Sequence, residues 1–243
     1  MARYAIVTDL RRCVGCQACT VACNAEWDVP PGQARTHVRT TVLEGTFPRL
    51  VQSPFVAQCN QCDRPPCVEA CPSGATAQRD DGIVSVDRAV CIGCGFCVEA
   101  CPYDARFIDP RLRKVDKCDF CLERIAHGEQ PACVTTCTAH AKYFGDLEQR
   151  DGQVFQLVYG RGARRLETPA VAVGPNVYYL GTAQQLDLVQ KSFPPREPRL
   201  PAAGEGWRRV VKPLVLAAVG ATFLGQAVAF FNQLAKGEKD FED

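Results

Sequence analysis

Sixteen cysteines, arranged in four groups of four with none left over, constrain this chain more than any other feature of its sequence. Groups one and three share the spacing C-x2-C-x2-C-x3-C, whereas groups two and four lengthen the middle gap to four and eleven residues. The groups therefore form an internal repeat. They comprise Cys13, Cys16, Cys19 and Cys23; Cys59, Cys62, Cys67 and Cys71; Cys91, Cys94, Cys97 and Cys101; and Cys118, Cys121, Cys133 and Cys137.

Disulfide bonds explain these cysteines poorly. A chain of 243 residues is longer than the small secreted scaffolds that need crosslinks to fold. The cysteine content, 16 of 243 residues, is also below the roughly 8–10% that is typical of short disulfide frameworks. The opening segment MARYAIVTDLRR has no uninterrupted apolar stretch, so we expect no secretory leader. We interpret the cysteines as metal ligands.

The spacing within the groups favours iron–sulfur clusters. Three thiolates at i, i+3 and i+6 can each bind a different iron of one compact cluster, and in two-cluster ferredoxins the fourth cysteine binds the other cluster. Gly15 and Gly93 lie inside these loops, where the backbone must turn sharply. Pro72 and Pro102 follow the fourth cysteine of groups two and three, as in the bacterial C-x2-C-x2-C-x3-C-P run.

Structural zinc is the alternative interpretation. Zinc sites usually take their cysteines as two separated pairs, a pattern that group four fits and that groups one and three do not. Sixteen ligands divided by four predict four [4Fe–4S] clusters, each with all its thiolates, and such saturated sites suit outer-sphere electron transfer. His37, His127 and His140 lie in no nucleophile or general-base pattern, so the sequence predicts no catalytic residue.

The predicted secondary structure consists of short elements, which makes the expected fold class α+β. Segments this short bury little apolar surface, so we expect the bound clusters to organise residues 1–145. One or two helical turns are expected after the third cysteine of groups one to three. The predicted strands cover Tyr4–Thr8, Pro54–Ala57, Ile83–Val86, Tyr143–Phe144 and Val177–Leu180.

The C-terminal part of the sequence predicts a membrane anchor. Residues 213–235 carry no charge, and as a helix they would measure roughly 34 Å, enough to cross a hydrocarbon core of about 30 Å. Basic residues flank both ends of this segment. The alternative is a buried C-terminal helix. We expect a cluster domain over 1–190, a proline-rich linker over 191–206, a transmembrane helix over 207–236 and a polar tail over 237–243.

The charge composition argues against a nucleic-acid partner. Lys and Arg total 28 against 27 Asp and Glu, for a net charge of +1. A nucleic-acid-binding protein needs a basic excess or a basic stripe to neutralise phosphates. The cluster of Arg161, Arg164 and Arg165 fits a solvated loop or a protein contact better.

These motifs resemble the four-cluster ferredoxin-like electron-transfer subunit of molybdopterin oxidoreductases. That family includes subunits of polysulfide, thiosulfate, tetrathionate, dimethyl sulfoxide and nitrate reductases and of respiratory formate dehydrogenase. The resemblance covers about residues 3–185 and is closest to the polysulfide and tetrathionate reductase type. Lys212-Pro213-Leu214 and Ala221-Thr222-Phe223 are similar to the anchor helix of the formate dehydrogenase subunit. The resemblance to the four-cluster subunit is carried by Cys118-x2-Cys121-x11-Cys133-x3-Cys137, Cys67-Val68-Glu69-Ala70-Cys71-Pro72, Pro131-Ala132-Cys133-Val134 and Phe144-Gly145-Asp146.

The resemblance implies which cysteines share a cluster: it pairs group one with group four and group two with group three in two double-cluster modules. The implied ligand sets are set A, Cys13, Cys16, Cys19 and Cys137; set B, Cys23, Cys118, Cys121 and Cys133; set C, Cys59, Cys62, Cys67 and Cys101; and set D, Cys71, Cys91, Cys94 and Cys97.

The resemblance also implies the partners. Electrons would pass through the four clusters between a molybdenum or tungsten bis-pterin catalytic subunit and a quinone- or haem-binding membrane subunit. The same role beside a nickel–iron hydrogenase is the alternative function, and a zinc scaffold is another. Flanking charges favour a cytoplasmic cluster domain, whereas the formate dehydrogenase-like anchor favours the outer face, which is the interpretation adopted here.

Overall fold

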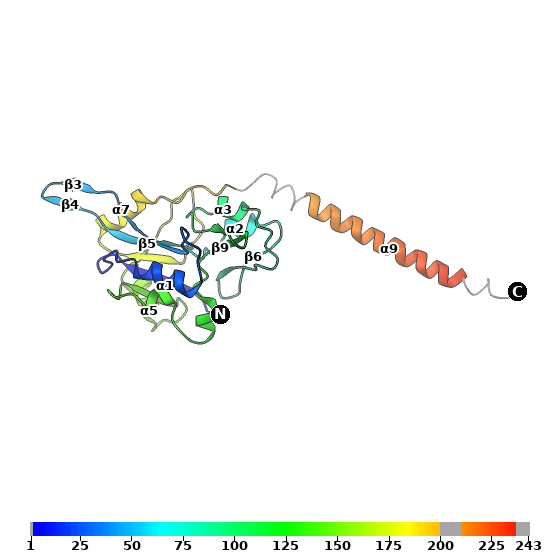
Figure 1. Ribbon diagram of the computed structural model, residues 1–243, viewed down its shortest axis with the longest axis horizontal. Coiled ribbons are helices and arrows are strands. Elements are labelled where there is room, and N and C mark those ends of the chain that lie inside the picture. Colours follow the sequence, from blue (N-terminus) through cyan, green and yellow to red (C-terminus); the bar gives the residue numbers. More distant parts are fainter. Residues whose placement is uncertain (1, 200–209, 237–243) are drawn as a thin grey trace. The chain divides into compact units, whose positions relative to one another are not determined.

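The computed structural model describes residues 2–199 and 210–236 of the chain. Its residues divide into two compact units, Met1–Leu200 and Pro201–Asp243, which are described separately. The first unit contains all the cysteines and consists of short strands and helices joined by long loops (Figure 1). The described part of the second contains the long helix α9 (Lys212–Lys236).

A four-stranded sheet forms the centre of the first unit, in the order β10-β1-β12-β11. Strand β1 pairs antiparallel with β10 and parallel with β12. Because side chains alternate along a strand, Ile6 of β1 packs into one apolar cluster, while Ala5 and Val7 pack into another on the opposite face. The strands span β1 (Tyr4–Asp9), β10 (Lys142–Asp146), β11 (Arg164–Arg165) and β12 (Val177–Leu180).

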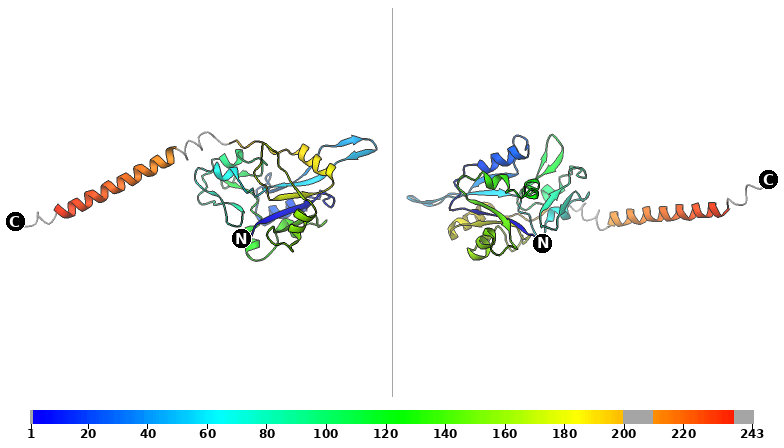
Figure 2. Two further views of the ribbon diagram at one scale, coloured as in Figure 1. Left: turned by 180° about the vertical axis from the view of Figure 1, so that it is seen from behind. Right: turned by 90° about the horizontal axis from the view of Figure 1, so that it is seen from below.

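The other strands form four antiparallel pairs of two. The β3–β4 hairpin projects from the body of the first unit, as the views from behind and from below also show (Figures 1 and 2). The pairs are β2 (Thr36–Thr40) with β5 (Pro54–Gln58), β3 (Glu44–Thr46) with β4 (Arg49–Val51), β6 (Thr76–Gln78) with β7 (Val84–Val86), and β8 (Phe107–Asp109) with β9 (Lys114–Asp116).

Short helices start near the third cysteine of each group. Helix α1 (Ala18–Glu26) begins one residue before Cys19, and α2 (Pro66–Glu69), α3 (Phe96–Glu99) and α5 (Ala132–Thr135) each begin one residue before theirs. Helix α1 packs against α5, and α2 packs against α3. The two helix pairs therefore join group one with group four and group two with group three.

The remaining helices lie outside these cysteine helix pairs. Helix α4 (Leu122–Ala126) follows Cys121. Helix α6 (Gln153–Phe155) continues into the π-helix η1 (Gln156–Gly160). Helix α7 (Ala183–Ser192) begins with a capping box in which Thr182 and Gln185 bond each other's backbone N–H.

The predicted α+β class is confirmed, and all five predicted strands are present with ends that differ from the prediction by at most two residues. Part of the predicted linker, residues 191–192, belongs to α7. Residues 200–206 of that linker, the first residues of the expected anchor (207–209) and the tail 237–243 lie outside the described residues.

Helix α9 is long and apolar enough over Pro213–Gln233 to cross a membrane. It is the only such helix in the described part of the chain, and its described side chains are exposed rather than packed in a core. The helix thus has the length and composition that the sequence predicts for residues 213–235.

Candidate iron–sulfur sites

None of the sixteen cysteines forms a disulfide bond. Cys16 and Cys94 are exposed, and Cys13, Cys71 and Cys137 are half-buried. The other eleven are buried. Most of the thiols are therefore shielded from water, as electron-transfer ligands need to be.

The set A cysteines line a single cavity. Cys13, Cys16 and Cys19 come from the loop before α1 and from its first turn, and Cys137 comes from the loop after α5. The side chains of Val38, Val56 and Lys142 complete the wall. Residues that lie more than a hundred positions apart in the sequence thus converge on one space.

The set B cysteines come from α1, which carries Cys23, from α5, which carries Cys133, and from the segment before α4, which carries Cys118 and Cys121. Burial first, and then the Cys133 and Cys121 sulfurs, raise the pKa of Cys23 to about 12. Burial also raises the pKa of Cys118, with added effects from Cys23 and Cys133. Thiols that raise one another's pKa in this way become favourable ligands when a cationic centre takes the place of their protons.

All four set C cysteines are buried. Burial raises the pKa of Cys62, and the sulfurs of Cys59, Cys67 and Cys101 add to the effect. The pKa of Cys101 is raised to about 11, again first by burial and then by Cys59. Cys59, Cys62 and Cys101 belong to the apolar cluster that covers one face of the central sheet.

The set D cysteines gather around α2 and α3. Cys91 and Cys97 are buried in one apolar cluster with Val84 and Val115, and Cys71 packs against that cluster. Cys94 lies in the same loop but is exposed. Its neighbour Gly93 has φ +69°. A Cβ atom there would collide with the carbonyl oxygen of Arg113, so only glycine fits the position.

Shared apolar clusters link neighbouring sets in a linear order. Cys19 of set A and Cys133 of set B belong to one cluster. Cys118 of set B and Cys59 of set C belong to a second cluster. Cys67 of set C and Cys97 of set D belong to a third. The sets therefore follow one another as A, B, C and D, an order that the sequence did not predict.

Backbone N–H groups point at the last cysteine of three groups. The N–H of Thr76 donates to Cys71 Sγ at 3.4 Å. Those of Ala105 and Ala141 donate to Cys101 Sγ at 3.5 Å and to Cys137 Sγ at 3.2 Å. Hydrogen bonds to sulfur stabilise a thiolate and influence the potential of a bound cluster.

Three side chains donate to cysteine sulfurs, and sequence reasoning missed all of them. Trp27 Nε1 lies 3.3 Å from Cys121 Sγ, Arg106 Nη2 2.8 Å from Cys67 Sγ, and Lys142 Nζ 3.3 Å from Cys133 Sγ. Burial lowers the pKa of Arg106, but Cys67 and Cys97 raise it more; Cys133 and Cys19 raise that of Lys142 against burial in the same way.

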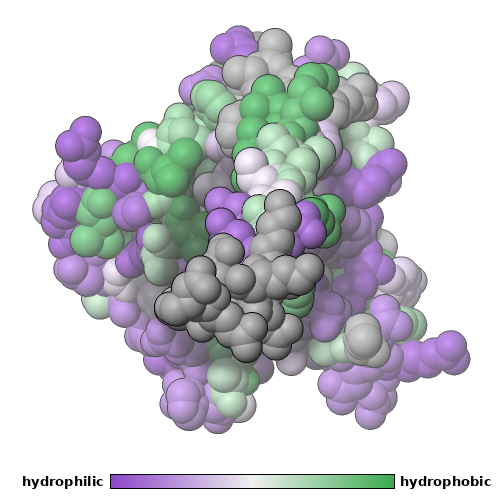
Figure 3. Space-filling view, turned by 90° about the vertical axis from the view of Figure 1, so that its right-hand side faces the viewer, coloured by the Kyte–Doolittle hydropathy of each residue, from purple (hydrophilic) through white to green (hydrophobic). Residues whose placement is uncertain are grey.

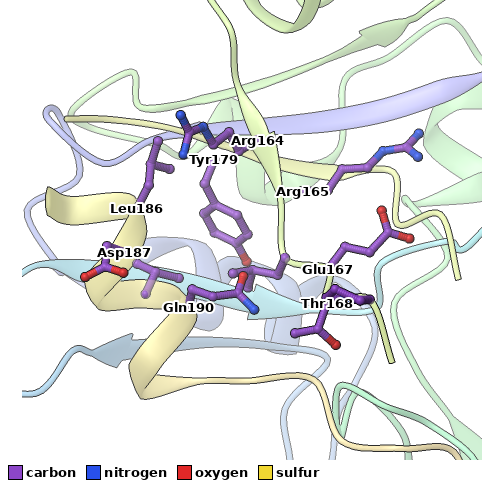
Figure 4. A pocket seen from close by; sticks show the side chains of 11 residues that line it. Arg164, Arg165, Glu167, Thr168, Tyr179, Leu186, Asp187 and Gln190 are labelled. Carbon is purple, nitrogen blue, oxygen red and sulfur yellow. The ribbon is translucent and has the colours of Figure 1, made fainter. Parts of the chain in front are cut away.

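A further cavity lies away from the cysteines, between β11, β12 and α7 (Figure 4). Tyr179 points into it, and Arg164, Glu167, Leu186 and Gln190 line it. No cysteine is among the described residues of its wall. Within the described residues, no three His, Cys, Asp or Glu side chains are placed to hold a single metal ion.

The set A cavity, the clustered sulfurs and the N–H donors suit an iron–sulfur electron-transfer subunit. Residues 51–147 match the family model described as a 4Fe-4S dicluster domain. Over 181 residues, 74% of its length, the chain is 44% identical to the B subunit of tetrathionate reductase from Salmonella typhimurium and covers 72% of that protein. The protein is a member of the family of 4Fe-4S dicluster electron-transfer subunits that serve molybdopterin reductases.

Other relatives agree with this membership. The thiosulfate reductase electron transfer subunit PhsB of Salmonella typhi is 43% identical over 62% of this chain and 80% of its own length. The B subunit of polysulfide reductase from Wolinella succinogenes is 38% identical over 67% of this chain and 86% of its own length. The predicted resemblance and the prediction of an electron-transfer role, rather than a catalytic one, are confirmed.

Proposed function

We propose that this chain carries electrons through four [4Fe–4S] clusters, held by sets A, B, C and D, between a molybdopterin catalytic subunit and a membrane subunit that binds quinone or haem. The linear order of the sets carries the proposal. In that order, the two exposed cysteines, Cys16 and Cys94, belong to the end sets A and D. A chain of electron-transfer clusters needs accessible ends, where partners exchange electrons with it, and a middle that is shielded from water.

The chain's own residues support this role. Each set supplies four thiolates, one for each iron of a cluster, and bound clusters would supply one-electron chemistry. The buried sulfurs of sets B and C keep water away from the inner part of the path. Trp27, Arg106 and Lys142 donate to sulfur atoms and thereby stabilise negative charge at the ligands.

Apolar side chains near both exposed cysteines suit docking of partner subunits. Val14 and Val21 are exposed beside Cys16, and Val90 and Ile92 are exposed beside Cys94. Hydrophobic residues also lie scattered among hydrophilic ones on the face shown in Figure 3. An exposed apolar group next to an electron-transfer ligand allows close approach and excludes water at the contact.

Helix α9 supports a single-pass anchor in the cell membrane, in contact with lipid. Its 21-residue apolar stretch, Pro213–Gln233, exceeds the 18 or so residues that a membrane span needs. We place the cluster domain on the extracytoplasmic face, on the basis of the similarity of α9 to the formate dehydrogenase anchor.

The test is a metal and sulfide analysis of the detergent-extracted complex, purified without oxygen. About sixteen iron and sixteen sulfide per chain, four of each for every set, are expected together with molybdenum or tungsten. About four zinc per chain without sulfide would overturn the electron-transfer role. Nickel in place of molybdenum or tungsten would select a hydrogenase partner instead.

A further inference from the structure

Arg106 and Lys142 occupy equivalent positions in the cysteine repeat. Arg106 stands five residues after Cys101, the last cysteine of group three, and Lys142 stands five residues after Cys137, the last of group four. In both cases the residue before the basic one is an alanine whose N–H donates to that last cysteine. The two modules therefore direct a basic side chain inward from the same point of the repeat.

Arg106 lies between the set C and set D cysteines. Its side chain donates from Nη2 to Cys67 Sγ at 2.8 Å and from Nη1 to Thr76 Oγ1 at 3.2 Å. The residue is only 5% exposed, and its Nε has no hydrogen-bond partner. Cys67 packs in one apolar cluster with Cys97 of set D.

Lys142 takes the corresponding place between sets A and B. Its Nζ donates to Cys133 Sγ of set B at 3.3 Å and to Gln58 Oε1 at 2.8 Å. The same side chain lines the cavity of set A beside Cys19. The residue is 4% exposed, so water does not solvate its charge.

Neither cation has a carboxylate partner among the described residues. Arg35, which is buried to the same degree, is ion-paired with Asp116. A buried charge without a countercharge is strongly destabilising. The anionic groups that contact Arg106 and Lys142 are the cysteine sulfurs, so the countercharge of each cation must come from whatever the two adjoining sets hold.

We propose that Arg106 and Lys142 are charge-compensating residues, one in each module, and that each stabilises the reduced state of the two clusters on either side of it. This inference rests on the proposed function. Each transfer moves one electron, which leaves the donor less negative and the acceptor more negative by one charge, with no bond formed or broken. A fixed cation in the low-dielectric interior favours the added negative charge. Because it is shared, it also offsets the repulsion between neighbouring reduced clusters.

The test compares neutral and charge-retaining variants of the whole membrane complex. Reduction of the clusters is followed by EPR during a redox titration of Arg106→Gln, Arg106→Lys, Lys142→Gln and Lys142→Arg. Each glutamine variant is expected to move two of the four reduction waves to lower potential, and the two variants are expected to move different pairs. The charge-retaining variants are expected to give clearly smaller shifts. Arg88→Gln, which removes a half-exposed arginine that contacts Asp116, is the matched control and should leave all four waves in place.

The possible results separate the two proposals. A wild-type complex without four clusters contradicts the proposed function itself. Four clusters whose potentials stay unchanged in both glutamine variants overturn only the inference. A shift of the same reduction waves in both glutamine variants also overturns it. If a glutamine variant loses clusters by iron and sulfide analysis while the charge-retaining variant keeps them, the requirement for charge is supported. Loss of clusters in both the glutamine variant and the charge-retaining variant overturns this requirement.

Discussion

Arg35 and Asp116 are joined by two hydrogen bonds in the interior of the first unit, from Nε to Oδ2 at 2.9 Å and from Nη2 to Oδ1 at 2.7 Å. Arg35 directly precedes β2, and Asp116 ends β9 just before group four begins. Their side chains are only 5% and 6% exposed. The pair thus holds the segment after α1 against the segment that leads into Cys118. Set B takes Cys23 from α1 and Cys118 from just after Asp116.

Asp116→Asn is expected to destabilise the protein by about 3–5 kcal/mol, because it leaves the buried Arg35 charge without its main partner. Arg88 contacts the same carboxylate at 2.9 Å but is 43% exposed, so Arg88→Gln should cost only about 0–1 kcal/mol. The measurement is denaturant unfolding, followed by loss of visible absorption. Equal effects of the two substitutions would contradict the structural assignment of Arg35 and Asp116 as the central pair.

Gly93→Ala should damage set D selectively. Gly93 and Gly82 both have positive φ angles, +69° and +79°, so alanine costs about 1–2 kcal/mol of backbone strain at either position. Only at Gly93 would the new Cβ collide with the Arg113 carbonyl oxygen, whereas nothing lies within 4 Å at Gly82. Iron and sulfide analysis should show loss of one cluster in Gly93→Ala and full content in Gly82→Ala. Full content in both would show that the loop around Cys94 adapts.

The Asp9 carboxylate should stabilise the loop before Cys13 in a pH-dependent way. Burial alone would raise the pKa of Asp9, but hydrogen bonds from the Arg11 side chain and N–H lower it by more. A lowered folded-state pKa gives stability that is present above the unfolded value of about 3.9 and is lost as the pH falls through the folded-state pKa.

Asp9→Asn should therefore lower stability at pH 7 by about 1–3 kcal/mol, since it weakens hydrogen bonds to a charged group. The difference from the wild type should narrow as the pH falls below about 4. Denaturant unfolding of both proteins at pH 7, 5 and 3 measures this difference in the free energy of unfolding. A difference that stays constant over this range would show that charge on Asp9 plays no part.

Removal of α9 should release the protein from the membrane. A chain that ends at Pro198 lacks the apolar span Pro213–Gln233 but keeps all sixteen cysteines. Expressed alone, it should enter the aqueous phase in detergent partitioning, whereas the full-length chain, the matched control, should enter the detergent phase. Retention of the truncated chain in the detergent phase would contradict the anchor role.

Much of the fold could be predicted from local sequence because its signals are local. Short apolar runs marked β1 and β12, and the cysteine spacing marked the turns that open α1 and α3. Helix α7 was missed, although its capping box, Thr182 followed by Gln185, was visible in the sequence. Strands β3 and β4 were missed because three-residue strands carry almost no periodic signal.

The cluster of Arg161, Arg164 and Arg165 shows what neighbouring residues in the sequence do not predict. Arg164 is exposed, as expected for a solvated residue, but Arg165 is half-buried. Its guanidinium donates to Tyr178 Oη and lies over the Tyr178 ring. Only the pairing of β11 with β12 brings the two residues together, so Arg165 is a structural residue rather than a solvated one.

The sequence by itself determined the family, because its four groups of closely spaced cysteines carry the family's motifs, and it marked a candidate membrane span, because 23 consecutive residues have no charge. Tertiary structure decided the rest. The order of the four sets depends on the packing of Cys19 with Cys133, of Cys118 with Cys59 and of Cys67 with Cys97 in shared apolar clusters. The placement of Arg106 and Lys142 depends on the same packing. Electrostatic interaction and electron transfer depend on the distance between groups in space, and only folding brings these groups together.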